Sequence, residues 1–322
     1  MSETLNNNPL VTILSPCYNV DAYLPQCLDS IINQTYTNLQ IVLMDDGSKD
    51  GTWGILQDYA SKDPRIEIYH QENLGVAATR NKLLDKVRGE YVLFVDSDDW
   101  IEPNMIEFLL DKATMGGYGI VTCAMIRNNE PFNNVAYREE VWNQDNVVKE
   151  FLRHIIFNGS LPNKLVRSCL FDRIRLDCGI SYGEDALFIW QVMQKVEKVL
   201  ITNKCLYHYR MNESSISHTS WSPNKKGSGH YVWKRIVEST EQLWPQYVDI
   251  AKARYAIEDM WGLYYASLAD YPCDEHIKER QKNVRDHLSL MRKSGLVSFN
   301  KIITAYALAY CYFIGKLLKY TI

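Results

Sequence analysis

The stretch Tyr91–Asp99, YVLFVDSDD, governs the interpretation of the rest of the chain. Its first five residues are aromatic, β-branched or leucine, a run typical of a strand buried on both faces. The carboxylates that follow, Asp96, Asp98 and Asp99, are rarely buried without a partner. We therefore expect them where the strand leaves the sheet, at the carboxyl edge where open α/β sheets bind ligands.

Asp96 and Asp98 are two residues apart, the spacing of a DxD element. Crowded carboxylates repel one another, and a hard divalent cation such as Mn²⁺ or Mg²⁺ relieves that repulsion. A cation held in this way can neutralise the diphosphate of a nucleotide-linked ligand. The alternative is a solvated turn that caps the helix expected from Pro103, and a motif this short does not decide between the two.

Composition narrows the class of protein. The chain has 322 residues, 46% of them hydrophobic and 23% charged, which is enough for a substantial core in one large or two ordinary domains. A net charge of −4 gives no reason to expect a nucleic-acid partner. The eight cysteines form no CxxC pair and no zinc-like cluster, and residues 1–9 carry no signal-peptide core. We therefore expect reduced thiols in a cytoplasmic protein.

Strand-like and helix-like segments alternate through the first 125 residues. The expected strands are 10–14, 39–44, 65–69, 91–95 and 118–125, and the expected helices are 24–32, 52–61, 76–87 and 103–113. This alternation predicts a mostly parallel sheet with helices on both faces. Because the strand 39–44 ends in Asp45 and Asp46, these acids should share an edge of the sheet with Asp96 and Asp98. The first strand is not followed by GxGxxG, which disfavours a dinucleotide fold of the usual kind.

A third acidic pair, Glu184 and Asp185, begins an apolar helical stretch at 186–193. Acids at a helix N-terminus are favoured by the helix dipole, so capping is one explanation and chemistry is the other. Downstream, 198–201 and 205–209 read as strands and 221–230 as a mobile loop. From residue 231 onward the pattern is helical.

The last expected helix spans 299–320. Its apolar run, 302–315, is too short to cross a bilayer comfortably. Flanking lysines and several tyrosines suit a helix that lies in a membrane interface. Packing in a C-terminal bundle or a dimer contact is the equal alternative.

Four motifs occur in order and at sensible spacing, and together they resemble the nucleotide-sugar glycosyltransferases of family 2. They are Val11–Asn19, Asp45–Thr52, Asn73–Gly75 with Ala78–Asn81, and Gly89–Asp99. The resemblance is strong over 10–125 and looser over 160–220. It implies a GT-A fold, with a catalytic domain at 1–222 (10–125 for the nucleotide-sugar and 126–222 for the acceptor) and a helical region at 223–322.

The resemblance also implies roles for individual residues. Asp46 would bind the uracil of a UDP-sugar, Pro16 and Tyr18 would frame the base and ribose, and Arg80 would lie near the nucleotide or brace the acids. Asp96 and Asp98 would hold the metal. The family keeps its general base at the position of Glu184-Asp185, and we favour Asp185. His208 and Arg210 lie near the segment that closes over donor phosphates in some relatives.

These roles fit the chemistry of an inverting transfer, which needs a base for the acceptor hydroxyl and stabilisation of the departing diphosphate. The expected acceptor is a saccharide, either lipid-linked or a surface polysaccharide precursor. Such an acceptor would place the enzyme in the cytoplasm or on the inner face of the cell membrane. The sequence does not decide whether the chain forms a homodimer. A nucleotidyltransferase is an alternative, but we would expect it to have a Gly-rich, basic loop after the first strand. Residues 15–19 are neither Gly-rich nor basic, which disfavours this alternative. A non-catalytic nucleotide-sugar binding module is the third hypothesis.

Overall fold

The computed structural model describes residues 8–127, 136–154, 157, 159–211 and 228–320. These residues form two compact units, described separately below. The sheet unit comprises the described residues within 1–147, 160–178 and 191–212, and the helical unit those within 148–159, 179–190 and 213–322. The expected domain boundary at 222 lies outside the described residues.

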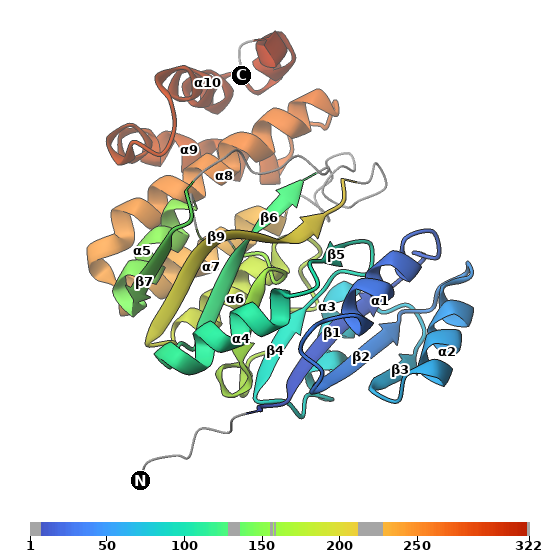
Figure 1. The fold of residues 1–322 in the computed structure, drawn as a ribbon. Coiled ribbons are helices and arrows are strands. Elements are labelled where there is room, and N and C mark those ends of the chain that lie inside the picture. Colours follow the sequence, from blue (N-terminus) through green and yellow to red (C-terminus); the bar gives the residue numbers. More distant parts are fainter. Residues whose placement is uncertain (1–7, 128–135, 155–156, 158, 212–227, 321–322) are drawn as a thin grey trace. The chain divides into compact units, whose positions relative to one another are not determined.

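The sheet unit contains a nine-stranded sheet, counted over the described residues (Figure 1). Its strands are β1 (Val11–Cys17), β2 (Leu39–Asp45), β3 (Ile66–His70), β4 (Tyr91–Phe94), β5 (Trp100–Ile101), β6 (Ile120–Arg127), β7 (Glu139–Asn143), β8 (Lys164–Arg167) and β9 (Lys198–Tyr209). The order is β3-β2-β1-β4-β8-β6-β9-β5, and β7 pairs with β9.

The first half of this sheet confirms the alternating pattern. Strands β3, β2, β1 and β4 run parallel, with Cys17 paired to Asp45 and Leu14 to Phe94. Strand β8 then inserts antiparallel between β4 and β6, while β6 and β9 run parallel. The carboxyl ends of β1, β2 and β4 therefore meet at one edge, as the sequence predicted.

Helices cover both faces of the parallel strands. The helices of the first half are α1 (Leu24–Ile32), α2 (Thr52–Lys62), α3 (Val76–Leu84) and α4 (Met105–Gly116). Alternate residues of β1, such as Val11 and Ile13, join one buried cluster with α1 and α4, because side chains alternate across a strand. Helix α3 packs against β1 and β2, and Figure 1 shows it on the opposite side of the sheet from α1 and α4. The unit is completed by the short helix η1 (Ser168–Phe171).

Two helices contribute residues to both units: α5 (Gln144–Arg153) and α6 (Glu184–Met193). The helical unit continues with α7 (Ser228–Leu243), η3 (Pro245–Tyr247), α8 (Val248–Leu268), α9 (Glu275–Ser294), α10 (Phe299–Tyr310) and η4 (Tyr312–Tyr320). Its core is a cluster of buried residues from α8, α9 and α10 with Tyr312. Of the loop expected at 221–230, residues 221–227 lie outside the described residues. Residues 228–230 form the beginning of α7 instead of a loop.

The final helix differs from the expectation. The helix expected over 299–320 ends at Tyr310, and Cys311 leaves helical geometry with φ −136° before η4 begins. Among the described residues, no helix combines the length and apolar character needed to cross a bilayer.

Candidate active site

The carboxyl edge of the parallel strands brings together the motifs of residues 15–19, 45–48 and 96–99. The backbone N–H of Asp46 donates to the carbonyl oxygen of Cys17 at 2.8 Å, and the Ser97 hydroxyl donates to the carbonyl oxygen of Pro16 at 2.8 Å. The end of β1 is thus held between the two acid-bearing loops. Tyr18 follows β1 directly, keeps 48% of its surface exposed and is available to a ligand.

Asp46 is a buried carboxylate that organises the loop before α3. It accepts hydrogen bonds from the backbone N–H of Leu74 at 2.8 Å and of Gly75 at 2.9 Å, and from Gln71 Nε2 at 2.7 Å. A carboxylate offers about four acceptor positions, so three protein donors leave room for one more. Gln71 is a contributor that the motif comparison did not single out.

Gly47 allows this loop packing. It has φ +74°, and a Cβ built on it would lie 2.8 Å from the backbone nitrogen of Asn73. Any other residue would therefore push the loop 45–48 away from the loop 71–75. The neighbouring acid, Asp45, is fully buried and lies 2.7 Å from His70 Nδ1.

At the end of β4, the acids lie against β9 and α3. Arg80 Nη2 forms an ion pair with Asp96 Oδ1 at 3.1 Å, so this arginine braces the first acid of the DxD element. The Tyr207 hydroxyl donates to Asp99 Oδ2 at 2.7 Å and accepts from the backbone N–H of Asp96 at 3.1 Å. Tyr207 was missed at the sequence level, because a tyrosine within an apolar strand reads as core.

Arg210, at the end of β9, also contacts this turn. Its backbone N–H donates to Asp99 Oδ1 at 2.8 Å, and its Nε donates to the carbonyl oxygen of Asp98 at 2.9 Å. His208 instead stacks on Trp100, with ring centroids 4.7 Å apart, and its Nε2 lies 2.6 Å from Glu102 Oε1. The Arg210 guanidinium also lies over the Trp100 ring, 4.8 Å from its centre, so the two residues share Trp100 while only Arg210 binds the acidic turn.

The electrostatics of the turn reflect crowded negative charge. Burial, followed by the charges of Asp96 and Asp98, raises the pKa of Asp99 to about 8. Among the described residues, no cluster of three or more His, Cys, Asp or Glu side chains forms a metal site of its own. Asp96 and Asp98 are two half-buried carboxylates, the number that Mg²⁺ sites commonly use when substrate phosphates complete the coordination. The residues present therefore fit a cation that arrives with a diphosphate.

Glu184 and Asp185 lie in the first turn of α6, within the helical unit. Glu184 is buried, whereas Asp185 is half-buried and its Oδ1 accepts a hydrogen bond from the backbone N–H of Ala186 at 2.8 Å. Burial raises the pKa of the adjacent Tyr182 to about 12, with contributions from the charges of Glu258 and Asp185. Asp185 is thus the more accessible acid of the pair.

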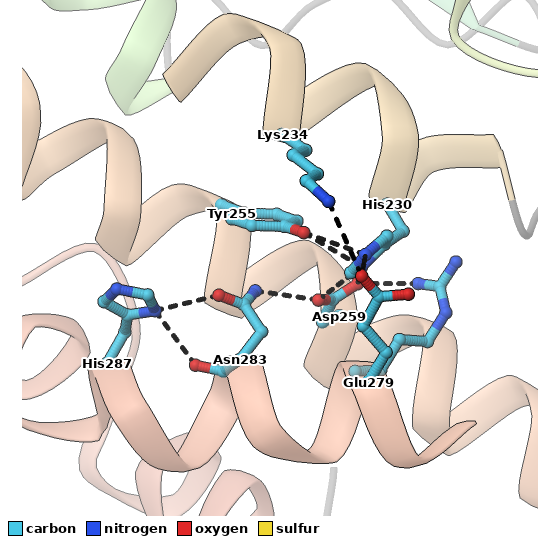
Figure 2. Close-up of polar contacts among 8 residues, drawn as sticks. His230, Lys234, Tyr255, Asp259, Glu279, Asn283 and His287 are labelled. Atoms are coloured by element: carbon cyan, nitrogen blue, oxygen red, sulfur yellow. Dashed lines mark hydrogen bonds and ion pairs between the residues drawn. The ribbon is translucent and has the colours of Figure 1, made fainter. Parts of the chain in front are cut away.

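A second polar cluster lies within the helical unit (Figure 2). Asp259 of α8 is fully buried, and both its oxygens lie within 2.9 Å of His230 Nδ1 of α7. From α9, Arg280 Nη1 donates to Oδ1 and Asn283 Nδ2 donates to Oδ2, each at 2.7 Å. Tyr255 Oη lies 2.9 Å from His230 Nε2. Because every partner comes from a packed helix, this cluster cross-links α7, α8 and α9.

Comparisons with known proteins agree with this geometry. The model of the family "Glycosyl transferase family 2" matches residues 12–175. The chain is 32% identical to the glycosyltransferase GlyA of Streptococcus pneumoniae, over 89% of this chain and 39% of that protein. It is 40% identical to the chondroitin synthase of Escherichia coli, over 34% of this chain and 16% of that protein. The chain belongs to glycosyl transferase family 2.

The fold comparison gives the same class. A crystal structure of Staphylococcus aureus TarS 1–349 in complex with UDP-GlcNAc superposes with a TM-score of 0.70, at 19% identity, covering 94% of this chain and 88% of that one. The GT-A architecture predicted from the sequence is thereby confirmed. The chain spans less than two thirds of the length of the curated relatives that it matches first.

Proposed function

We propose that this chain is an inverting glycosyltransferase that moves a sugar from a UDP-sugar to a hydroxyl group of a saccharide acceptor. The observation that carries the proposal is the edge of the sheet unit, where Asp46 and the Asp96–Asp99 turn meet around the loop of Pro16 and Tyr18. At one half of this edge, the Asp46 carboxylate can accept one more hydrogen bond and the Tyr18 ring is exposed, and both features suit a nucleobase. The other half offers crowded carboxylates.

The diphosphate end of the donor belongs at these carboxylates. Asp96 and Asp98 would hold Mn²⁺ or Mg²⁺, and the cation would supply charge neutralisation for the leaving diphosphate. Arg80 keeps Asp96 in place, and the contacts of Arg210 and Tyr207 fix the backbone of the turn. A prearranged turn costs little reorganisation when the donor binds.

Asp185 is proposed as the general base. It would accept the proton of the acceptor hydroxyl, whose oxygen then forms a bond to the anomeric carbon as the bond to the diphosphate breaks. Attack from the face opposite the leaving group inverts the configuration, and UDP departs with the bonding electron pair. Asp185 is favoured over Glu184 because it is the more exposed of the two.

The acceptor is proposed to be a saccharide in the synthesis of a polysaccharide, either free or attached to a lipid carrier at the inner face of the cell membrane. The relatives support the saccharide, since one of them is named a chondroitin synthase. A UDP-sugar donor is favoured because TarS was crystallised with UDP-GlcNAc. The exposed ring of Tyr18 also provides a surface on which a nucleobase can stack.

Calorimetric titration with UDP, with and without Mn²⁺, tests the donor site. We expect wild-type binding to require Mn²⁺ and to be lost in Asp98→Ala, while the control Asp111→Asn, an exposed acid on α4, binds as the wild type does. Absence of UDP binding in every protein, with or without metal, would rule out the UDP-sugar assignment.

The base is tested separately with Asp185→Asn. This variant should bind UDP normally and lose about 10²–10⁴-fold in transfer rate, because only the proton acceptor is removed. The exposed acid Asp172 supplies the control substitution, Asp172→Asn. Transfer at near the wild-type rate in Asp185→Asn would exclude Asp185 as the base, and product anomers analysed by NMR would report the stereochemistry.

A further inference from the structure

The last two helices of the helical unit, α10 and η4, expose six large apolar side chains. We propose that this surface, named the aromatic stripe, docks the enzyme onto an anionic lipid surface. It consists of Phe299, Ile303, Tyr306, Tyr310, Phe313 and Leu317, each between 52% and 76% exposed. The first four recur every three or four residues and therefore lie on one side of α10, whereas Phe313 and Leu317 follow in η4.

The folding of the helical unit does not account for this stripe. Helix α10 already buries its other side, where Thr304, Ala305, Leu308 and Ala309 enter the core. A helix with a single packed side normally turns polar residues to water. A contiguous exposed apolar surface on a protein marks an interaction site. Tyr306 and Tyr310 lie in ring contact, with centroids 4.8 Å apart, so these two rings form a joined surface on α10.

Charge identifies the partner as anionic. Residues 282–322 contain seven Lys or Arg and a single Asp, a formal charge of +6 in a chain whose total is −4. One of these cations borders the stripe directly, because the Arg285 guanidinium lies 5.8 Å from the centre of the Tyr310 ring. Lys or Arg beside an apolar helical face is the pattern of helices that lie on anionic membranes.

A second copy of the chain is the competing occupant, and the same charge disfavours it. Two identical stripes facing each other would bring two strongly cationic segments together, which is repulsive. Tyrosine also suits the lipid interface, because its ring is apolar while its hydroxyl stays hydrated. The lipid surface therefore satisfies both the apolar and the charged features of this region.

Vesicle flotation with the full chain tests the docking. The probes are phosphatidylcholine vesicles with and without phosphatidylglycerol. We expect binding to the anionic vesicles that weakens with added salt, and a loss of about tenfold or more in the variant Tyr306→Ser/Tyr310→Ser/Phe313→Ser, which removes buried aromatic area at the interface. The variant Arg292→Glu/Lys293→Glu should lose binding to anionic vesicles as well, because both side chains are exposed cations of this segment.

Leu243→Ser is the matched control, an exposed apolar residue on α7 of the same unit, and it should bind vesicles as the wild type does. Circular dichroism of each variant checks the fold. Equal vesicle binding by the wild type and the stripe variant would overturn the proposal. Absence of vesicle binding, together with a dimer in sedimentation that the stripe variant dissociates, would assign the stripe to a second copy instead.

This inference is independent of the proposed transfer reaction. The stripe variant should retain Mn²⁺-dependent UDP binding, because no residue of the stripe belongs to the sheet unit. Loss of vesicle binding with intact UDP binding is therefore the expected combination. Failure of UDP binding in the wild type would count against the donor assignment alone.

Discussion

The two acidic clusters of this chain differ in how completely their charge is paired. In the helical unit, the Asp259 carboxylate accepts hydrogen bonds from Arg280 and Asn283 and lies beside His230. A second carboxylate, Glu279, lies 3.5 Å from the same histidine. In the sheet unit, three carboxylates share one turn. Arg80 there pairs with Asp96, while Asp99 receives an uncharged hydroxyl and a backbone N–H.

The comparison separates a structural site from a ligand site. A buried charge that is fully paired within the protein holds helices together and gains little from any further partner. Three acids crowded into one turn keep a capacity for a cation, and there burial, followed by the charges of Asp96 and Asp98, raises the pKa of Asp99. Burial alone would not have distinguished them, because Asp99 and Asp259 are both almost completely buried.

The largest expected effect comes from removing the paired acid. Asp259→Ala leaves the Arg280 guanidinium buried without its partner, so we expect a loss of about 3–5 kcal/mol in the free energy of unfolding of the helical unit. Denaturant titration followed by circular dichroism measures this loss. The exposed acid Asp286 on α9 supplies the control, and Asp286→Ala should change little. A small effect of Asp259→Ala would mean that the cluster does not cross-link the helices.

The raised pKa of Asp99 in the sheet unit predicts a pH dependence of stability. Because the pKa of Asp99 is raised to about 8 in the folded chain from 3.8, the folded state holds a proton that the unfolded state releases between these values. Stability contributed by Asp99 is therefore fully present below pH 3.8 and is lost as pH rises through about 8.

Thermal unfolding at several pH values, compared between wild type and Asp99→Asn, measures this contribution. The asparagine carries no titrating proton, so the variant should lose less stability than the wild type on going toward pH 8. Asp111→Asn, the exposed control on α4, should follow the wild type. Parallel pH profiles for wild type and Asp99→Asn would show that folding does not raise the pKa of Asp99.

The smallest effect is expected for Tyr207→Phe. This change removes one hydroxyl and leaves the Asp96 N–H and the Asp99 carboxyl without that partner, which should cost about 1–3 kcal/mol in stability. Mn²⁺-dependent UDP affinity should fall several-fold, since the turn loses a support. Tyr69→Phe is the control, because that hydroxyl makes only a 3.4 Å contact with Glu67. Unchanged stability and affinity in Tyr207→Phe would remove Tyr207 from the positioning of the turn.

Local sequence predicted the parallel half of the sheet well, for a physical reason. Strands such as β2, buried at all seven positions, need continuous apolar runs, and helices such as α1 need apolar residues at helical spacing. The two-residue strand β5 was missed because it is too short for any period. Strand β9 was expected as two segments, whereas the structure forms one strand across the polar residues 202–204.

In the last 22 residues of the described chain, 299–320, the local sequence pattern did not predict where the helix ends. Residues 299–320 have helical propensity throughout, so the sequence predicts one helix. The structure ends α10 at Tyr310, and Gly315 then lies so close to Ser267 of α8 that a Cβ would meet its side chain at 2.6 Å. The break therefore accompanies a close approach to α8, which no local pattern reports.

The strands and helices of the parallel half, the acids at its strand ends and the family were thus determined by the amino-acid sequence alone, because apolar periodicity and short motifs are local properties. The partners of each acid were decided only by tertiary structure. Tyr207 reaches Asp99 across 108 positions of the chain, and Asp259 is paired by residues from two other helices. Whether a carboxylate is left with surplus charge or neutralised depends on such distant donors, which packing alone brings within hydrogen-bonding distance.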